Sequence, residues 1–308
     1  KVALMTCIAR GFNEDEVGDI VRLCHDYRDF IRGIYFLPLA QTWDIEEFPV
    51  QPERITTEDM EMLFDDAFQD QNIQFVPAGA LGQLKSLINC LGTKKPPFAG
   101  AHPNCESMYL LISDGEQFRP ISEYLTDNFP ELIGELFDTN ERLGKLEKKS
   151  TTTLRGRLLS KLGLGTAWRR FRAVLALLGV LRKHVRTWDL IQGRHVSKLW
   201  HLLAFGPALA FGSSSRRALA KHTNIGPQLQ IIVLPFEDNA TLETERLERC
   251  PNAFVYYDPD EDKVGWVPTC AWSLHKDQIM HRIMHHYEKE ESSAALASSR
   301  QASSHQGE

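Results

Sequence analysis

Six cysteines, at positions 7, 24, 90, 105, 250 and 270, are the residues of this 308-residue chain with the widest range of possible chemistry. None of them forms a C-x-x-C pair, so the spacing excludes a zinc ribbon and a thioredoxin motif. A chain long enough to bury a sizeable core does not need a disulfide framework. We therefore expect a reducing, cytoplasmic compartment, and we expect Cys7, Cys24 and Cys90 to be ordinary buried thiols.

Two histidines and one asparagine also stand at spacings that are typical of a metal site or of a helix cap. His281 and His285 share one helix face at i, i+4 spacing, which can bind a metal ion. The sequence suggests no third ligand, so we expect a surface or core role for both. Asn13 precedes a helical pattern with Glu16 three residues later, which is typical of an N-cap in a capping box.

The composition is that of a soluble globular protein, with 43% hydrophobic and 25% charged residues. The sequence contains no signal-peptide pattern and no apolar run of about 18 residues. The net charge of -6 gives no sign of general nucleic-acid binding. Because Lys1 is followed directly by a strand-like apolar run, we expect the chain to be a fragment or a processed product.

The basic residues are concentrated in one region. Residues 142–198 contain fifteen Lys or Arg and only two acids, Glu147 and Asp189. Helices are expected there at 154–164, 167–186 and 195–205, with an apolar face that includes Trp168 beside the arginines. Such a region can be a solvated helical subdomain or can lie on an anionic membrane surface. Nucleic acid is a third option, but no nucleic-acid motif accompanies the charge.

The elements that must position these residues begin with a βαβ unit. Strands are expected at 2–8 and 31–39, with a helix between them that ends near Tyr27, and short links make the two strands parallel. A helix at 57–68, a strand at 73–77 and a helix at 82–90 follow. The next expected elements are a strand at 108–112 with a hairpin turn at 113–116, a helical stretch at 121–146 that breaks before Pro130, and a buried strand at 229–235.

The last part of the chain is expected to hold a short helix at 242–250 and a hairpin formed by 254–257 and 264–267. A helix at 276–289 follows the hairpin. The Ser-, Ala- and Gln-rich tail, 291–308, is expected to be disordered.

Several of these segments resemble the radical S-adenosylmethionine (SAM) enzymes. VALMTCIARGFNEDE (2–16) is similar to the fifth barrel strand and its following turn, and IYFLPL (34–39) is similar to the sixth strand. The HPNC loop (102–105), the hairpin after it and the late pairing of Cys250 with Cys270 resemble one subgroup. That subgroup comprises the pterin dimethyltransferases and the tetraether lipid synthases, and the resemblance covers roughly 1–125 and 225–290.

The resemblance implies an enzyme that uses SAM and a [4Fe-4S] cluster. A 5′-deoxyadenosyl radical would abstract hydrogen from an unactivated carbon of a pterin-like or lipid substrate, for methylation or carbon–carbon bond formation. Cys105, Cys250 and Cys270, with His102 as a fourth ligand, would hold an auxiliary cluster, since such clusters need thiolates from separate segments. Asn13 would contact SAM at the barrel mouth.

Each of these assignments has a simpler alternative. The three cysteines can be ordinary buried thiols, His102 a capping or loop residue, and Asn13 an N-cap only. The sequence also departs from the family, because the C-x-x-x-C-x-x-C motif that binds the SAM cluster is absent. The Val76-Pro77 step, often followed by cysteine in the subgroup, is followed here by Ala78.

The predicted fold class is α/β: the last βα units of a partial (βα)6 radical SAM barrel, plus an α+β C-terminal region with a helical insertion. The predicted regions are the barrel part at 1–95, the cluster loop and hairpin at 96–141, the basic helical insertion at 142–215, the C-terminal cluster region at 216–290 and the tail. On this view the chain alone is inactive and lacks the N-terminal half of its barrel. The alternative function is a non-catalytic module that binds a membrane or a partner through the basic helices.

Overall fold

The structure is a computed structural model. It describes residues 1–43, 46, 53–69, 73–91, 101–152, 165–186, 190–193, 195–210 and 221–304. The chain divides into two compact units. Unit 1 consists of Lys1–Leu39 and Gln51–Pro235, and unit 2 consists of Ala40–Val50 and Phe236–Glu308. The five regions expected from the sequence form a finer division, which stays a prediction.

Unit 1 is built on a mixed six-stranded sheet. Its strands are β1 (Val2–Ile8), β2 (Ile31–Pro38), β3 (Val76–Pro77), β4 (Ser107–Ser113), β5 (Phe118–Pro120) and β6 (Gln228–Val233). The order is β1-β2-β6-β4-β3, and β5 also pairs with β4. β1, β2 and β6 are parallel to one another, as expected for the βαβ unit, while β4 is antiparallel to β6, β3 and β5. The chain is therefore an α/β protein, and its sheet is mixed.

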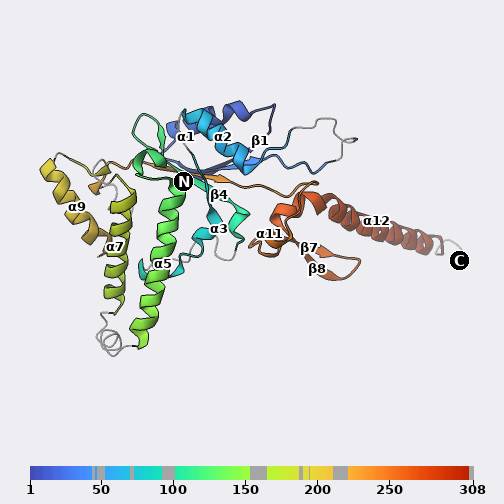
Figure 1. Cartoon of the computed structure of the whole chain (residues 1–308). Coiled ribbons are helices and arrows are strands. Elements are labelled where there is room, and N and C mark those ends of the chain that lie inside the picture. Colours follow the sequence, from blue (N-terminus) through green and yellow to red (C-terminus); the bar gives the residue numbers. More distant parts are fainter. Residues whose placement is uncertain are drawn as a thin grey trace. The chain divides into compact units, whose positions relative to one another are not determined.

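Helices α1 and α2 cover one face of this sheet (Figure 1). α1 (Val17–Asp26) buries Val17, Val21 and Cys24, which are spaced to lie on one helix face. α2 (Thr57–Phe68) begins with a capping box in which the side chain of Thr56, one residue before the expected Thr57, accepts a hydrogen bond from the backbone N–H of Asp59. The apolar faces of both helices pack on the strands, so this side of the sheet holds the main core.

The other described helices of unit 1 lie later in the chain, and two of them add Phe129, Leu132, Ile133 and Val180 to the same core. They are α3 (Ala78–Leu81), α4 (Lys85–Leu91), α5 (Phe129–Thr152), α7 (Gly165–His184) and α9 (His195–Ala210). Short 3-10 turns lie at Glu14–Glu16, Pro103–Cys105 and Ile121–Tyr124. α7 packs between α5 and α9 (Figure 1). The helix expected at 154–164 lies outside the described residues.

Unit 2 combines a short helix, a hairpin and a long helix. α11 (Thr244–Glu248) precedes the antiparallel pair β7 (Ala253–Asp258) and β8 (Lys263–Pro268), and a 3-10 turn at Thr269–Ala271 leads into α12 (Trp272–Ser304). The structure differs from the expected disordered tail, because α12 continues to Ser304. The tail is rich in alanine, which has the highest helix propensity, so a helix already formed upstream extends into it.

Candidate functional site

One edge of the sheet gathers the segments that the sequence singled out in unit 1. The strand register aligns Thr6 with Phe36, Phe36 with Val233, Val233 with Ser107 and Ser107 with Pro77. Because β4 runs antiparallel, it starts at the edge where β1, β2, β3 and β6 end. The turn after β1, the loop before β4 and the segment after β3 therefore lie along this one carboxyl edge of the sheet. In barrel enzymes this is the edge that bears the active site.

The loop before β4 holds Cys105 in a tight turn. The imidazole Nδ1 of His102 accepts a hydrogen bond from the backbone N–H of Asn104 at 3.3 Å, and the N–H of Cys105 donates to the carbonyl of His102 at 3.0 Å. Cys105 is buried. Gly79 lies so close that a Cβ there would collide with the His102 carbonyl oxygen. The turn thus needs glycine at position 79, and it holds the imidazole of His102 and the thiol of Cys105 in one short segment.

The position where the subgroup often has a cysteine lies next to this turn. The N–H of Ala78 donates to the carbonyl of Glu106 at 2.7 Å, and the Ala78 side chain is fully buried. A thiol at position 78 would therefore stand beside the Cys105 segment. This chain has a methyl group there instead, and His102 supplies an imidazole at the same turn.

Glu106 is a site residue that the sequence reading did not single out. Its Oε2 atom is buried and has no hydrogen-bond partner among the residues that the structure describes. Burial raises the pKa of Glu106 to about 7. Burial and, after it, the charge of Glu106 raise the pKa of Tyr35. The sequence signal that could have identified Glu106 is its position directly before a buried strand.

Asn13 fixes the turn that follows β1. Its Oδ1 accepts from the N–H of Ala9 at 2.9 Å, and its Nδ2 donates to the carbonyl of Cys7 at 3.0 Å. The expected side-chain cap is wrong, because Asn13 makes no capping hydrogen bond. Glu14 instead accepts from the N–H groups of Gly11 and Phe12, at the start of the 3-10 turn that intervenes before α1. Contact between Asn13 and SAM stays a prediction.

In unit 2 the hairpin brings the segments of the other two cysteines together. Ala253 stands opposite Pro268 in the register of β7 and β8. The thiol of Cys250 donates to the carbonyl of Asn252 at 2.9 Å, and the N–H of Thr269 donates to the same carbonyl at 3.2 Å. The chain around Cys250 and the turn that contains Cys270 thus meet at one oxygen atom.

A buried ion pair supports both of these segments. Glu237 and Arg246 have side chains only 1% and 5% exposed, and Nε of Arg246 lies 2.9 Å from Oε1 of Glu237. The N–H of Glu237 also donates to the carbonyl of Cys270 at 3.2 Å. Glu237 therefore links α11, which leads into Cys250, with the turn at Cys270. Sequence reading missed this pair because nothing in the local pattern marks two charged residues as buried.

The remaining candidates are placed as follows. Cys24 and Cys90 are buried as expected, but Cys7 is exposed. The expectation for Cys7 was wrong because alternate side chains of β1 point away from α1 and α2. The rings of His281 and His285 stack at 6.3 Å on α12, on side chains that are exposed. Among the described residues no three His, Cys, Asp or Glu side chains are grouped as ligands of one ion.

Comparison with known proteins gives one informative result. No family model matches the chain. The sequence is 24% identical over 284 residues to the 7,8-dihydro-6-hydroxymethylpterin dimethyltransferase of Methanocaldococcus jannaschii, a match that covers 90% of this chain and 49% of that protein. The chain resembles a pterin dimethyltransferase. The resemblance inferred from the sequence is thereby confirmed, and the chain spans about half the length of the curated relative it matches.

Proposed function

We propose that this chain is part of a radical SAM methyltransferase that acts on a pterin-like substrate. The observation that supports this most is the similarity to a pterin dimethyltransferase over 284 residues, which include most of this chain. The parallel strands β1, β2 and β6, with α1 and α2 on one face, suit the last βα units of a partial barrel. On this proposal the carboxyl edge of the sheet faces SAM and the substrate.

The ligand types at the candidate site fit an iron–sulfur cluster. Thiolates from separate loop segments are the usual ligands, and an imidazole can replace one of them. His102 and Cys105 come from one tight turn of unit 1, while Cys250 and Cys270 come from segments of unit 2 that meet at the Asn252 carbonyl. Such a cluster would supply redox chemistry at the site.

The residues around the site would have distinct tasks. Asn13 holds the turn after β1 in shape and would contact SAM from there. Glu106, with a buried oxygen that lacks a partner in the described part of the chain, would hydrogen-bond the substrate. In the full-length enzyme a 5′-deoxyadenosyl radical would abstract hydrogen from an unactivated carbon. A lipid is the second candidate substrate, since the sequence also resembles the tetraether lipid synthases.

Anaerobic reconstitution with iron and sulfide tests the cluster ligands. The chain should bind iron and sulfide in equal amounts and give a cluster signal in electron paramagnetic resonance after reduction. Cys105→Ser, Cys250→Ser and Cys270→Ser should each lower the bound iron, whereas Cys7→Ser, at an exposed site, should not. Equal iron in all four variants would remove the basis for the cluster.

Pterin binding separates the catalytic proposal from the non-catalytic alternative. The chain should quench the fluorescence of a 6-hydroxymethylpterin, and Glu106→Ala should weaken that binding. A chain that binds neither iron nor pterin would favour the alternative, a module that acts through its basic helices alone.

A further inference from the structure

Helix α7 exposes an apolar stripe to solvent. Trp168, Phe171 and Leu175 lie at i, i+3 and i+7, so they share one helix face. Their exposed fractions are 48%, 38% and 51%. The rings of Trp168 and Phe171 stack with their centroids 5.7 Å apart. Three large apolar side chains thus form a continuous exposed surface, which we call the α7 stripe.

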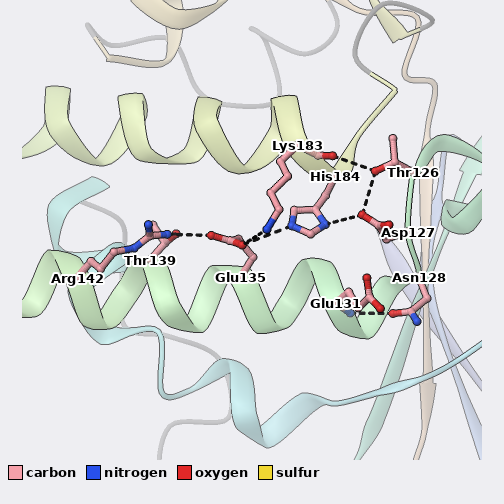
Figure 2. Close-up of polar contacts among 9 residues, drawn as sticks. All are labelled: Thr126, Asp127, Asn128, Glu131, Glu135, Thr139, Arg142, Lys183 and His184. Atoms are coloured by element: carbon pink, nitrogen blue, oxygen red, sulfur yellow. Dashed lines mark hydrogen bonds and ion pairs between the residues drawn. The ribbon is translucent and has the colours of Figure 1, made fainter.

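The opposite face of α7 is fixed to the rest of unit 1. Ala173 and Val180 are buried there. At the end of the helix, buried His184 has Nδ1 3.2 Å from Asp127 and Nε2 3.6 Å from Glu135 (Figure 2). Lys183 Nζ adds a 2.6 Å ion pair to the same Glu135. These polar contacts with α5 and the residues before it set the rotation of α7, which leaves the α7 stripe exposed, with Leu175 at the edge of a groove that α7 forms with α5.

Helix α9, which packs against α7, has an exposed apolar surface of its own. Leu199, Trp200 and Leu203 are each more than half exposed. Leu199 and Leu203 are one turn apart, and Trp200 lies beside them on the helix surface. None of the helices formed by the described residues is long and apolar enough to cross a bilayer. An apolar face of this kind suits a helix that lies flat on an interface.

The charge of α7 and α9 indicates which kind of partner surface the two helices would bind. Neither α7 nor α9 contains an Asp or a Glu. Arg172 follows Trp168 by four residues and Arg182 follows Leu175 by seven, so both arginines flank the α7 stripe. Basic side chains beside large apolar ones match a surface with negative headgroups above a hydrocarbon layer. A nucleic acid would satisfy the charge but would leave the leucines in water.

We propose that α7 and α9 bind the surface of an anionic phospholipid bilayer. The helices lie parallel to the membrane, with Trp168, Phe171, Leu175 and the exposed side chains of α9 inserted at the headgroup boundary. Arg172 and Arg182 contact lipid phosphates. This role does not depend on the proposed enzymatic function.

Vesicle co-sedimentation tests the electrostatic part of the proposal. The whole chain should bind phosphatidylglycerol vesicles at low salt, release at high salt and ignore phosphatidylcholine vesicles. Each basic residue is worth about fivefold in partitioning, so Arg172→Glu with Arg182→Glu should lower binding by at least about 25-fold. The control Lys276→Glu with Lys289→Glu, which changes exposed residues of α12, should keep it. Unchanged binding by the arginine variant overturns the proposal.

A second variant tests the apolar part. Changing Trp168, Phe171 and Leu175 together to Gln should lower binding about tenfold or more, with circular dichroism unchanged. The control Val255→Ser with Trp266→Ser removes exposed apolar side chains of the β7–β8 hairpin and should bind normally. Light scattering that shows the α7 stripe joining two copies would overturn the proposal. So would oligonucleotide binding that survives loss of the stripe while vesicles are ignored.

Discussion

The buried pair of Glu237 and Arg246 permits a quantitative prediction. The Glu237 carboxylate receives two hydrogen bonds from the guanidinium on Oε1 and one from the backbone N–H of Glu243 on Oε2, at 3.1 Å. Arg246→Met keeps an unbranched apolar side chain but removes the guanidinium and its positive charge. The carboxylate is then left buried with a single backbone donor.

The expected loss of stability in Arg246→Met follows from the burial of the ion pair. Removing one partner of a buried ion pair costs about 3–5 kcal/mol, because the remaining charge is uncompensated. Each 1.4 kcal/mol is a factor of ten, so the opening of unit 2 should become about 10²–10⁴ times more frequent. Replacing both residues, Glu237→Leu with Arg246→Met, leaves no buried charge and should cost much less than the single change.

Hydrogen exchange measured by mass spectrometry over α11 and the β7–β8 hairpin is the appropriate assay. Lys145→Met is the matched control, since its pair with Glu141 at 2.7 Å is two-thirds exposed and is worth at most about 1 kcal/mol. The reasoning is refuted if Arg246→Met changes protection no more than Lys145→Met. It is equally refuted if the double variant is as unstable as the single one.

Three further outcomes are expected. Gly79→Ala should destabilise unit 1 by about 1–3 kcal/mol in urea unfolding, because the added Cβ meets the His102 carbonyl. The control Gly134→Ala, whose Cβ would have nothing within 4 Å, should stabilise the protein by up to about 1 kcal/mol. Equal effects of the two substitutions would contradict this prediction. Burial alone would raise the pKa of Asp114, but Arg119 and two backbone N–H groups outweigh it and hold the pKa at about 2, below the ordinary 3.8. The stability from Asp114 is therefore present above pH 3.8 and lost as pH falls toward 2, and Asp114→Asn should flatten that part of the acid-unfolding curve; an unchanged curve would argue against it. With dithionite and SAM, the chain alone should form no 5′-deoxyadenosine by chromatography, because it lacks the three-cysteine motif, and clear formation would overturn that view.

The local elements of unit 1 were predictable because their signals are local. β1 and the start of β2 follow from continuous apolar runs, and α2 from its apolar spacing after a threonine cap. The hairpins at β4–β5 and β7–β8 follow from turn residues between apolar segments. In each case the decisive residues lie within a few positions of one another.

The order of strands was not predictable in the same way. β6 pairs with β2 on one side and β4 on the other, although α5, α7 and α9 separate it from both in sequence. No local pattern records such a pairing, because it depends on tertiary packing. The candidate site could likewise be predicted only in part. The turn at Cys105 was marked by its own residues, whereas the burial of the Glu106 oxygen and of Glu237 depends on segments far away in the chain.

The central position of β6 has a consequence for how this protein folds. Until β6 is present, the sheet exists only as two halves, β1 with β2 and β3 with β4 and β5. Loop closure across the helices between Pro120 and Gln228 must therefore precede completion of the core, which slows folding and leaves apolar strand faces open in the meantime. During synthesis the helices before β6 emerge from the ribosome first, and the last strand of the sheet to be made is the one that joins its halves.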